Sequence, residues 1–287
     1  MKKRLFLLSR IILPVLLLTA CKKDTGPAIN PSVETAHLLA TIHYTDDVDN
    51  VVYDSLQYDS SQHLRQLKII FTDAVSSGGF YYTYNRIGKQ VLSKEYGLDN
   101  IEIPGTASTY TLNNQGFTDN RVYSIFDNIS NVNLEYRNQF EYTPDNYLKK
   151  ISNFRSSGNS LNSVFEFSYN NNNILDSISG YQNVGNSLEK KVVWFFQFDI
   201  GKKNTIGNSW MSSDLDDALN IGGKSQAYAL SKETTIIYDS QRKRSLYQED
   251  HYDNQYDDKG NIITRSGTSN YFQTDGSILD SLKKNYA

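Results

Sequence analysis

The chain has 287 residues, of which 38% are hydrophobic and 13% aromatic, and its formal net charge at pH 7 is −3. Disordered chains are poor in aromatic residues, so this composition excludes bulk disorder, and 5 Pro with 17 Gly exclude collagen-like and proline-rich designs. The 28 Asn residues favour turns over long helices. The composition therefore predicts a globular, all-β protein, and it indicates architecture more clearly than activity.

The first 20 residues have the pattern of an export signal. Met1 is followed by Lys2, Lys3 and Arg4, and an apolar segment then runs from Ile11 to Ala20. This segment is shorter than the about 20 apolar residues that a membrane-spanning helix needs. We therefore predict that residues 1–20 are a signal peptide that is removed on maturation.

The end of this signal, Leu18-Thr-Ala-Cys21, resembles the lipobox of bacterial lipoproteins. The resemblance implies that Cys21 is acylated, becomes the first residue of the mature protein and holds it at a membrane. Cys21 is the only cysteine, so no internal disulfide can form. A chance thiol at an ordinary cleavage site is the alternative interpretation. Lys22-Lys-Asp24 resembles the charged leader of Bacteroidota-type lipoproteins, which implies an outer-membrane lipoprotein on the periplasmic or the surface face of the cell envelope.

Residues 21–36 lack hydrophobic periodicity and are predicted to form a lipid-anchored tether before a domain at residues 37–287. Without the four basic residues of the signal, the mature chain has 25 Lys and Arg against 32 Asp and Glu, a net charge of −7. An acidic surface argues against nucleic acid as a partner. The expected partners are the membrane, through the N-terminal lipid, and a glycan or an envelope protein.

A hairpin-like unit recurs along the predicted domain. Each unit has an apolar or aromatic strand, a polar turn that opens with Asp or Asn in most copies, and a second strand rich in Leu, Ile or Val. The first strands end 26, 28, 30, 27 and 29 residues apart, at Tyr58, Tyr84, Leu112, Tyr142, Tyr169 and Phe198. Two further copies run from Tyr238 to Leu246 and from Tyr256 to Ile262.

The predicted turns place Asn or Asp first and Gly three residues later, at Asn85…Gly88, Asn113…Gly116 and Asp257…Gly260. Gly adopts the left-handed conformation at little cost, and Asn173 is the next best residue at the same place in another unit. A further turn is predicted between Asp199 and Gly201. Thr143 departs from the pattern because it stands where the other copies have Asp or Asn.

These units resemble the YD repeats of bacterial Rhs-type proteins and the hairpin repeats of Bacteroidota lipoproteins that carry an uncharacterised β-rich domain. The resemblance covers about residues 50–285. It implies a long antiparallel meander, either a curved sheet or an open barrel-like wrap, and it implies no activity. Closure of the sheet into a barrel is left open. Between Phe198 and Tyr238, Ser212 and the acids after it predict one short helix or a long loop near residues 212–222.

The search for catalytic chemistry gives few candidates. The sequence contains no nucleophile elbow, zinc motif, phosphate loop or dinucleotide fingerprint, so no catalytic residue and no cofactor are predicted. The four histidines lack metal-ligand spacing. Asp47 and Asp49 are candidate calcium ligands, with a solvated loop as the other interpretation.

Three aromatic side chains, Tyr81, Tyr82 and Trp210, are candidate ligand-binding residues because flat rings with polar edges suit stacking on sugars. Trp194 alternates with Phe196 and is expected to be buried. The predicted function is a non-enzymatic binding or scaffolding domain on an envelope lipoprotein. The alternatives are a carbohydrate-active hydrolase that uses paired carboxylates, and a purely structural surface spacer.

Overall fold

The structure, a computed structural model, describes residues 41–46, 51–61, 63–72, 77–127, 132–155, 160–204, 226–258, 260, 262–272 and 277–286. Strands and turns make up this part of the chain, and it contains no helix. Three predicted segments lie outside the described residues: the signal at 1–20, the tether at 21–36 and the helix or loop near 212–222. Among the described residues, no helix is long and apolar enough to span a bilayer.

The strands, in chain order, are β1 (Thr41–Asp46), β2 (Val51–Tyr58), β3 (Leu64–Thr72), β4 (Ser77–Ile87), β5 (Gln90–Gly97), β6 (Ser108–Leu112), β7 (Thr118–Asp127), β8 (Val132–Tyr142), β9 (Leu148–Arg155), β10 (Ser160–Tyr169), β11 (Leu175–Val184), β12 (Ser187–Lys203), β13 (Tyr228–Tyr238), β14 (Arg244–Tyr256), β15 (Ile262–Phe272) and β16 (Ile278–Tyr286).

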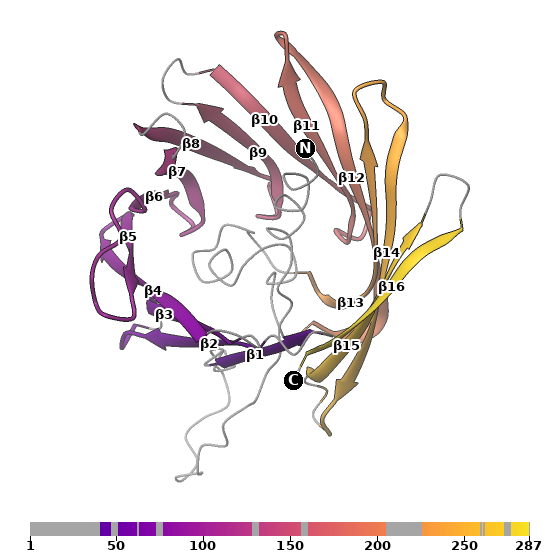
Figure 1. Ribbon diagram of the computed structural model, residues 1–287, viewed down its shortest axis with the longest axis horizontal. Coiled ribbons are helices and arrows are strands. Elements are labelled where there is room, and N and C mark those ends of the chain that lie inside the picture. The colour runs from indigo at the N-terminus through magenta and orange to yellow at the C-terminus, as the bar shows by residue number, and fades with distance from the viewer. Residues whose placement is uncertain are drawn as a thin grey trace.

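The strands form one antiparallel meander that curves until its two ends meet, so that β5 and β14 lie across the ring from each other (Figure 1). β1 pairs with β16 through Tyr44–Tyr286, Thr45–Asn285 and Asp46–Lys284, and the strand order is that of a closed barrel. The predicted all-β meander of hairpins is confirmed. The contact between the first and last strands answers the question of closure, which the sequence had left open.

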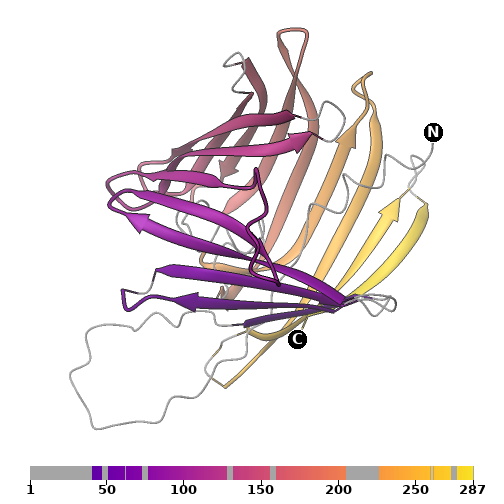
Figure 2. The ribbon, with the colours of Figure 1, turned by 60° about the vertical axis from the view of Figure 1, so that its left-hand side comes forward.

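Because successive strands run in opposite directions, their turns alternate between two ends of the barrel. The first rim, as we call it, carries the turns after the even-numbered strands β2 to β14. The second rim carries the turns after the odd-numbered strands, including the tips of the β11–β12 and β13–β14 hairpins, which project at the top of Figure 2.

The turn between β6 and β7 has the predicted chemistry. The N–H of Asn113 donates to the carbonyl of Phe117 (2.8 Å), and the side-chain oxygen of Asn113 accepts from the N–H groups of Gln115 (2.9 Å) and Phe117 (3.0 Å). Gly116 has φ +86°, a conformation that costs Gly little. The predicted roles of Asn113 and Gly116 are therefore confirmed.

The same turn recurs in other hairpins, with its first residue at Asp59, Thr143, Asn170 and Asp239. The side-chain oxygen of each first residue accepts from the N–H four positions later, and in Thr143 this acceptor is the hydroxyl, which bonds to Tyr147 N–H (3.1 Å). Thr143 thus keeps the turn geometry although it lacks the carboxylate or amide. The left-handed position is occupied by Asn146, Asn173 and Arg242 in three of these turns.

A β-bulge follows each of these turns and sets which residues face the interior. Tyr142 pairs with Leu148, but Glu141 pairs with Lys150, so one residue of β9 is extra. Because of this extra residue, Leu148 and Ile151 lie on the same face although they are three positions apart. In five hairpins of the first rim, the first residue of the strand after the turn is buried. These residues are Leu64, Thr118, Leu148, Leu175 and Ile262.

Tyrosine side chains connect neighbouring hairpins at the first rim. The hydroxyl of Tyr142 donates to the carbonyl of Thr118, and that of Tyr169 to the carbonyl of Leu148, both at 2.6 Å. The rings of Tyr147 and Tyr169 are 5.3 Å apart between centroids. These two hairpins are therefore held against the hairpins that precede them, as expected for units that bury their apolar face only when stacked.

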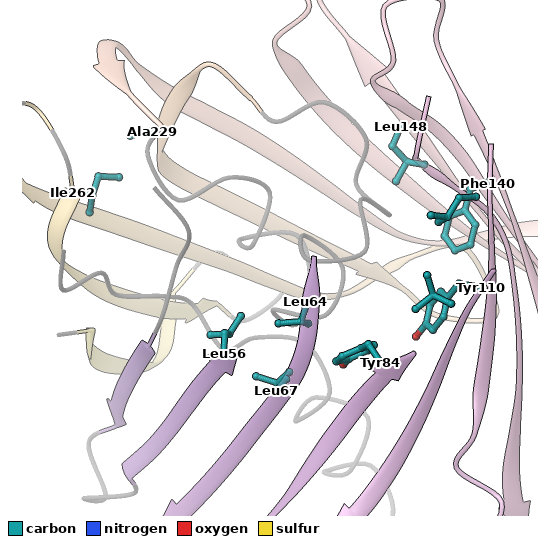
Figure 3. Packing of buried hydrophobic residues seen from close by; sticks show 11 residues of the cluster. Leu56, Leu64, Leu67, Tyr84, Tyr110, Phe140, Leu148, Ala229 and Ile262 are labelled. Carbon is teal, nitrogen blue, oxygen red and sulfur yellow. The ribbon is translucent and has the colours of Figure 1, made fainter. Parts of the chain in front are cut away.

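The inner face of the wall carries the apolar core. Leu56, Leu67, Tyr84, Tyr110 and Phe140 extend from neighbouring strands toward a common interior (Figure 3). A second cluster continues the core along the later strands with Leu175, Ile178, Phe196, Leu230 and Tyr252, and Trp194 packs against it half-buried. Most of these residues lie near the first rim.

Two residues that were predicted to begin turns, Asn85 and Asp199, lie within strands instead. Asn85 pairs with Leu92 inside the β4–β5 ladder, and the turn is the two-residue loop Gly88–Lys89. Gly88 has a positive φ (+59°), which two-residue hairpins favour, but Asn85 does not begin the turn. Asp199 lies within β12, where it pairs with Ala229, and β12 continues to Lys203, which pairs with Tyr228, the first residue of β13.

Candidate functional site

The two neighbouring tyrosines predicted to bind a ligand lie on opposite faces of β4, because successive side chains of a strand alternate. Tyr81 faces outward and stacks on Tyr96, with ring centroids 5.1 Å apart, and its hydroxyl donates to Asn100 Oδ1 (3.0 Å). Tyr82 faces inward and packs against the apolar core beside Phe80. The structure therefore does not bring Tyr81 and Tyr82 together on one surface.

Tyr82 belongs to a half-buried polar group on the inner face, where it pairs with Glu95 across β4 and β5. Burial, together with the charge of Glu95, raises the pKa of Tyr82 well above its ordinary value. Burial also raises the pKa of Glu95, and the hydrogen bond from Tyr82 opposes that rise. The phenol therefore keeps its proton and donates to the carboxylate, which stabilises the pairing of β4 with β5.

The remaining predicted site residues lie outside the described residues: Cys21, Trp210, Asp47 and Asp49. Within the described part of the chain, no three His, Cys, Asp or Glu residues are grouped so as to hold a metal ion. The lipidation of Cys21 and the calcium interpretation of Asp47 and Asp49 stay predictions.

Two carboxylates face each other across β13 and β14, where Glu233 and Asp250 are register partners. They are 4% and 3% exposed. Ser269 Oγ donates to Asp250 Oδ1, Gln248 Nε2 donates to Asp250 Oδ2 (2.8 Å), and Thr235 Oγ1 donates to Glu233 Oε1 (3.3 Å). Glycoside hydrolysis needs two acids that a substrate can reach. The burial and the hydrogen bonds of this pair indicate instead that the two carboxylates stabilise the packing of β13, β14 and β15.

A hollow of about 350 Å³ lies at the second rim, between the tips of the β11–β12 and β13–β14 hairpins. Its lining residues are Tyr181, Leu188, Lys190, Tyr238 and Arg242. Small-molecule sites commonly have volumes of roughly 300–1,000 Å³, so this hollow is at the lower end of that range.

Sequence reasoning missed this hollow because its residues come from two hairpins that are distant in the chain. Tyr181 and Lys190 are register partners across β11 and β12, so they lie on one face of the sheet. One signal was available in the sequence. Arg242 occupies the turn position that Gly or Asn fills in other copies, and this departure marks the hairpin tip.

Known proteins resemble this chain in fold. No protein-family model matches the sequence, and no curated protein matches it significantly. A crystal structure of a porin-like protein from Bacteroides uniformis superposes with a TM-score of 0.60, at 17% identity, over 86% of this chain and 94% of that one. A porin-like protein from Bacteroides vulgatus superposes with a TM-score of 0.53, at 9% identity, over 86% of this chain and 97% of that one. At these identities the similarity shows a shared β-rich fold alone.

Proposed function

We propose that this protein is an envelope lipoprotein whose barrel stands in water beside an outer membrane, tethered through Cys21, and acts as a non-enzymatic scaffold that binds a partner. The observation that carries the proposal is the presence of charged side chains and ion pairs on the outer wall of the barrel. Together with a lipid anchor, a polar wall supports attachment by the tether in place of insertion of the barrel itself.

Exposed charged side chains alternate with core residues in β3, β8 and β10. Lys68 is exposed beside Leu67, Glu141 beside Phe140, and Glu166 between two inward-facing aromatic residues. A barrel that crosses a membrane needs a continuous apolar band outside, and a Lys or Arg on that band costs about 2–4 kcal/mol at the bilayer midplane. Lys68, Glu141 and Glu166 are therefore suited to water and not to lipid.

Ion pairs on the outer wall strengthen this argument. Lys150 lies 3.8 Å from Glu141 across β8 and β9, and Lys232 lies 2.7 Å from Glu249 across β13 and β14. Burial alone would raise the pKa of Glu249, but hydrogen bonds from Lys232 and two other side chains outweigh it and lower the pKa to about 2. Glu249 is therefore charged at neutral pH, on the face that would meet lipid in an inserted barrel.

Two further observations support the envelope location and the scaffold role. The lipobox-like Leu18-Thr-Ala-Cys21 predicts a lipid anchor, and two of the structural neighbours are Bacteroides proteins described as porin-like. Two tyrosine hydrogen bonds join neighbouring hairpins at the first rim, and such contacts favour a scaffold that positions its second-rim loops for binding.

The test separates the anchor from the wall. Residues 1–20 are replaced by an export signal of the non-lipoprotein kind, and Cys21→Ser is introduced, while the rest of the chain is kept. The expected result is loss of fatty-acid labelling and transfer of the folded protein to the soluble periplasmic fraction. The unchanged chain, as the control, should be labelled and should sediment with membranes.

Retention of the anchor-free variant in membranes after washing with high salt would contradict the proposal, because the wall itself would then be inserted. Fatty-acid labelling that survives Cys21→Ser would contradict the assigned attachment point.

A further inference from the structure

The hollow at the second rim combines two flat rings with two cations. Tyr181 and Tyr238 are half-buried, whereas Lys190 and Arg242 are exposed. Gly180, next to Tyr181, faces the core, where an added Cβ would meet Val192 and Phe165. Tyr181 therefore points outward, away from the core, and the hollow opens on the outer side of the wall.

The side chain of Lys190 is already oriented over the ring of Tyr181. The Nζ of Lys190 lies 5.5 Å from the centre of the Tyr181 ring, within the range of a cation–π contact. A preoriented cation loses less conformational entropy when it binds an anion. Leu188 adds an apolar surface, with 44% of the side chain exposed.

The two hairpin tips are cationic although the chain as a whole is acidic. Residues 183–191 and 238–244 contain five basic residues against two acidic ones, namely Lys190, Lys191, Arg242, Lys243 and Arg244 against Glu189 and Asp239. Lys191 Nζ bonds to Glu189 Oε2 (2.7 Å), and this contact, assisted by the charge of Arg242, lowers the pKa of Glu189. Glu189 and Lys191 therefore largely compensate each other, and the positive charge beside the hollow belongs to Lys190 and Arg242.

Arg242 occupies a backbone position where most side chains are disfavoured. Its φ is +61°, and the equivalent residues of other turns are Gly116, Asn146 and Asn173. Gly and Asn are the residues that adopt this conformation most readily. An Arg at this position is not explained by the turn itself, whereas a role in the hollow that it lines explains it.

We infer that this hollow binds an acidic sugar unit of a glycan, with the ring faces of the sugar against Tyr181 and Tyr238 and its carboxylate or sulfate group against Lys190 and Arg242. The inference rests on the proposed binding role and names the class of ligand. Tyrosine rings offer a flat apolar surface with a polar edge, which suits a saccharide. The guanidinium of Arg242 can donate two parallel hydrogen bonds to a carboxylate or sulfate.

The binding experiment uses the whole lipoprotein in a non-ionic detergent. Retardation is measured in native gels that contain chondroitin sulfate or polygalacturonate, with dextran as a neutral glycan and polyglutamate as an acidic chain without sugars. The expected result is retardation by one or both acidic glycans, and little by dextran or polyglutamate. The sulfated and carboxylated glycans show which acidic group is preferred.

Variants then locate the site. Arg242→Gly and Tyr181→Ala should each weaken glycan binding about tenfold, as measured by the glycan concentration for half retardation. The matched controls are Arg65→Ala, an exposed cation of the first rim, and Tyr96→Ala, an outward ring of β5, and both should bind as the unchanged protein does. Because Arg242→Gly relieves a disfavoured backbone conformation, its melting temperature should not fall, so its loss of binding cannot be attributed to unfolding.

Several outcomes would overturn the inference. These are equal weakening by Arg65→Ala, equal retardation by polyglutamate, and glycan binding that Arg242→Gly and Tyr181→Ala both leave unchanged. Failure to bind any acidic glycan would also overturn the inference. In that case, solubility of the anchor-free variant would still support the proposed placement of the barrel in water. Membrane retention of that variant would instead contradict the proposed function, whatever the glycans do.

Discussion

The two rims of the barrel are built differently although the same strands connect them. At the first rim, turns that begin at Asn113, Thr143 and Asn170 repeat one hydrogen-bonding pattern. Three second-rim connections lie within the described residues, and they differ from one another. Gly185 and Asn186, with φ +57° and +70°, form a two-residue turn, and residues 98–107 form a longer connection. The turn at Asp239 repeats the first-rim hydrogen bonds but carries an Arg in the left-handed position.

This difference indicates a division of roles between the rims. The first-rim turns after β2, β6, β8, β10 and β14 are each accompanied by a bulge and followed by a buried residue, and in two of these hairpins a tyrosine bonds to the preceding hairpin, whereas the β4–β5 turn has no bulge. A change in one of these elements alters contacts in two hairpins. Of the second-rim turns that the structure describes, the one that begins at Asp239 contributes Arg242 to the hollow. We therefore expect stability to depend on the first rim and binding on the second.

The largest expected effect comes from a matched pair of leucine truncations. Leu148→Ala removes a first-rim side chain that is 2% exposed and should lower the free energy of unfolding by about 2–5 kcal/mol. Leu98→Ala, at the second rim, removes a side chain that is 46% exposed and should change it by less than about 0.5 kcal/mol. Urea unfolding followed by circular dichroism measures both. Equal losses would mean that the two rims contribute equally to the free energy of unfolding.

A smaller effect is expected from the tyrosine that connects two hairpins. Tyr169→Phe leaves the carbonyl of Leu148 without the phenol donor and should lower the free energy of unfolding by about 1–3 kcal/mol. Tyr81→Phe is the control, because its bond to Asn100 is exposed and its removal should have little effect. A neutral Tyr169→Phe would show that the bond does not hold the hairpins together.

The pH dependence gives a second readout for Tyr169. Burial, with a contribution from Tyr147, raises the pKa of Tyr169 above the ordinary value of 10.0. Above about pH 10 the unfolded chain loses this proton while the folded chain keeps it, so stability falls as the pH rises. The melting temperature of Tyr169→Phe should therefore fall less steeply between pH 9 and 11 than that of the unchanged protein.

The smallest effects come from exchanging residues at the left-handed turn position. Gly116→Ala should lower the free energy of unfolding by about 1 kcal/mol, since φ is +86° and no neighbouring atom limits the space. Arg242→Gly should raise it by up to about 1 kcal/mol for the same reason in reverse. Thermal melting compares the two variants. A loss in both would contradict the view that Arg242 is retained for binding.

Much of the fold could be predicted from local residue chemistry. Asn113 and Gly116 specify their turn directly, because a short acceptor and a residue that tolerates positive φ are both present. The bulges were not predictable from alternation, which places Leu64 and Leu67 on opposite faces, whereas the extra residue in β3 brings both into the core. Val164 also departs from simple alternation, since it lies on the face opposite Phe165 and is still only 1% exposed.

The candidate site was less predictable because it depends on which hairpins become neighbours. Tyr81 and Tyr82 are adjacent in sequence but face opposite sides of the wall, whereas Tyr181 and Tyr238 are far apart in sequence and line one hollow. Residue type identified flat rings as candidates for sugar binding. Only the pairing of β12 with β13 shows which rings can act together.

The seam between β1 and β16 has a mechanical consequence. β1 is held by three residue pairs to β16 and by five to β2, whereas β2 is held to β3 by eight. If the lipid anchors the chain upstream of Thr41, any tension between membrane and ligand is transmitted through β1, the most weakly attached strand. Under force the ring should open at this seam first, and the hairpins from β3 onward would remain assembled as a curved sheet.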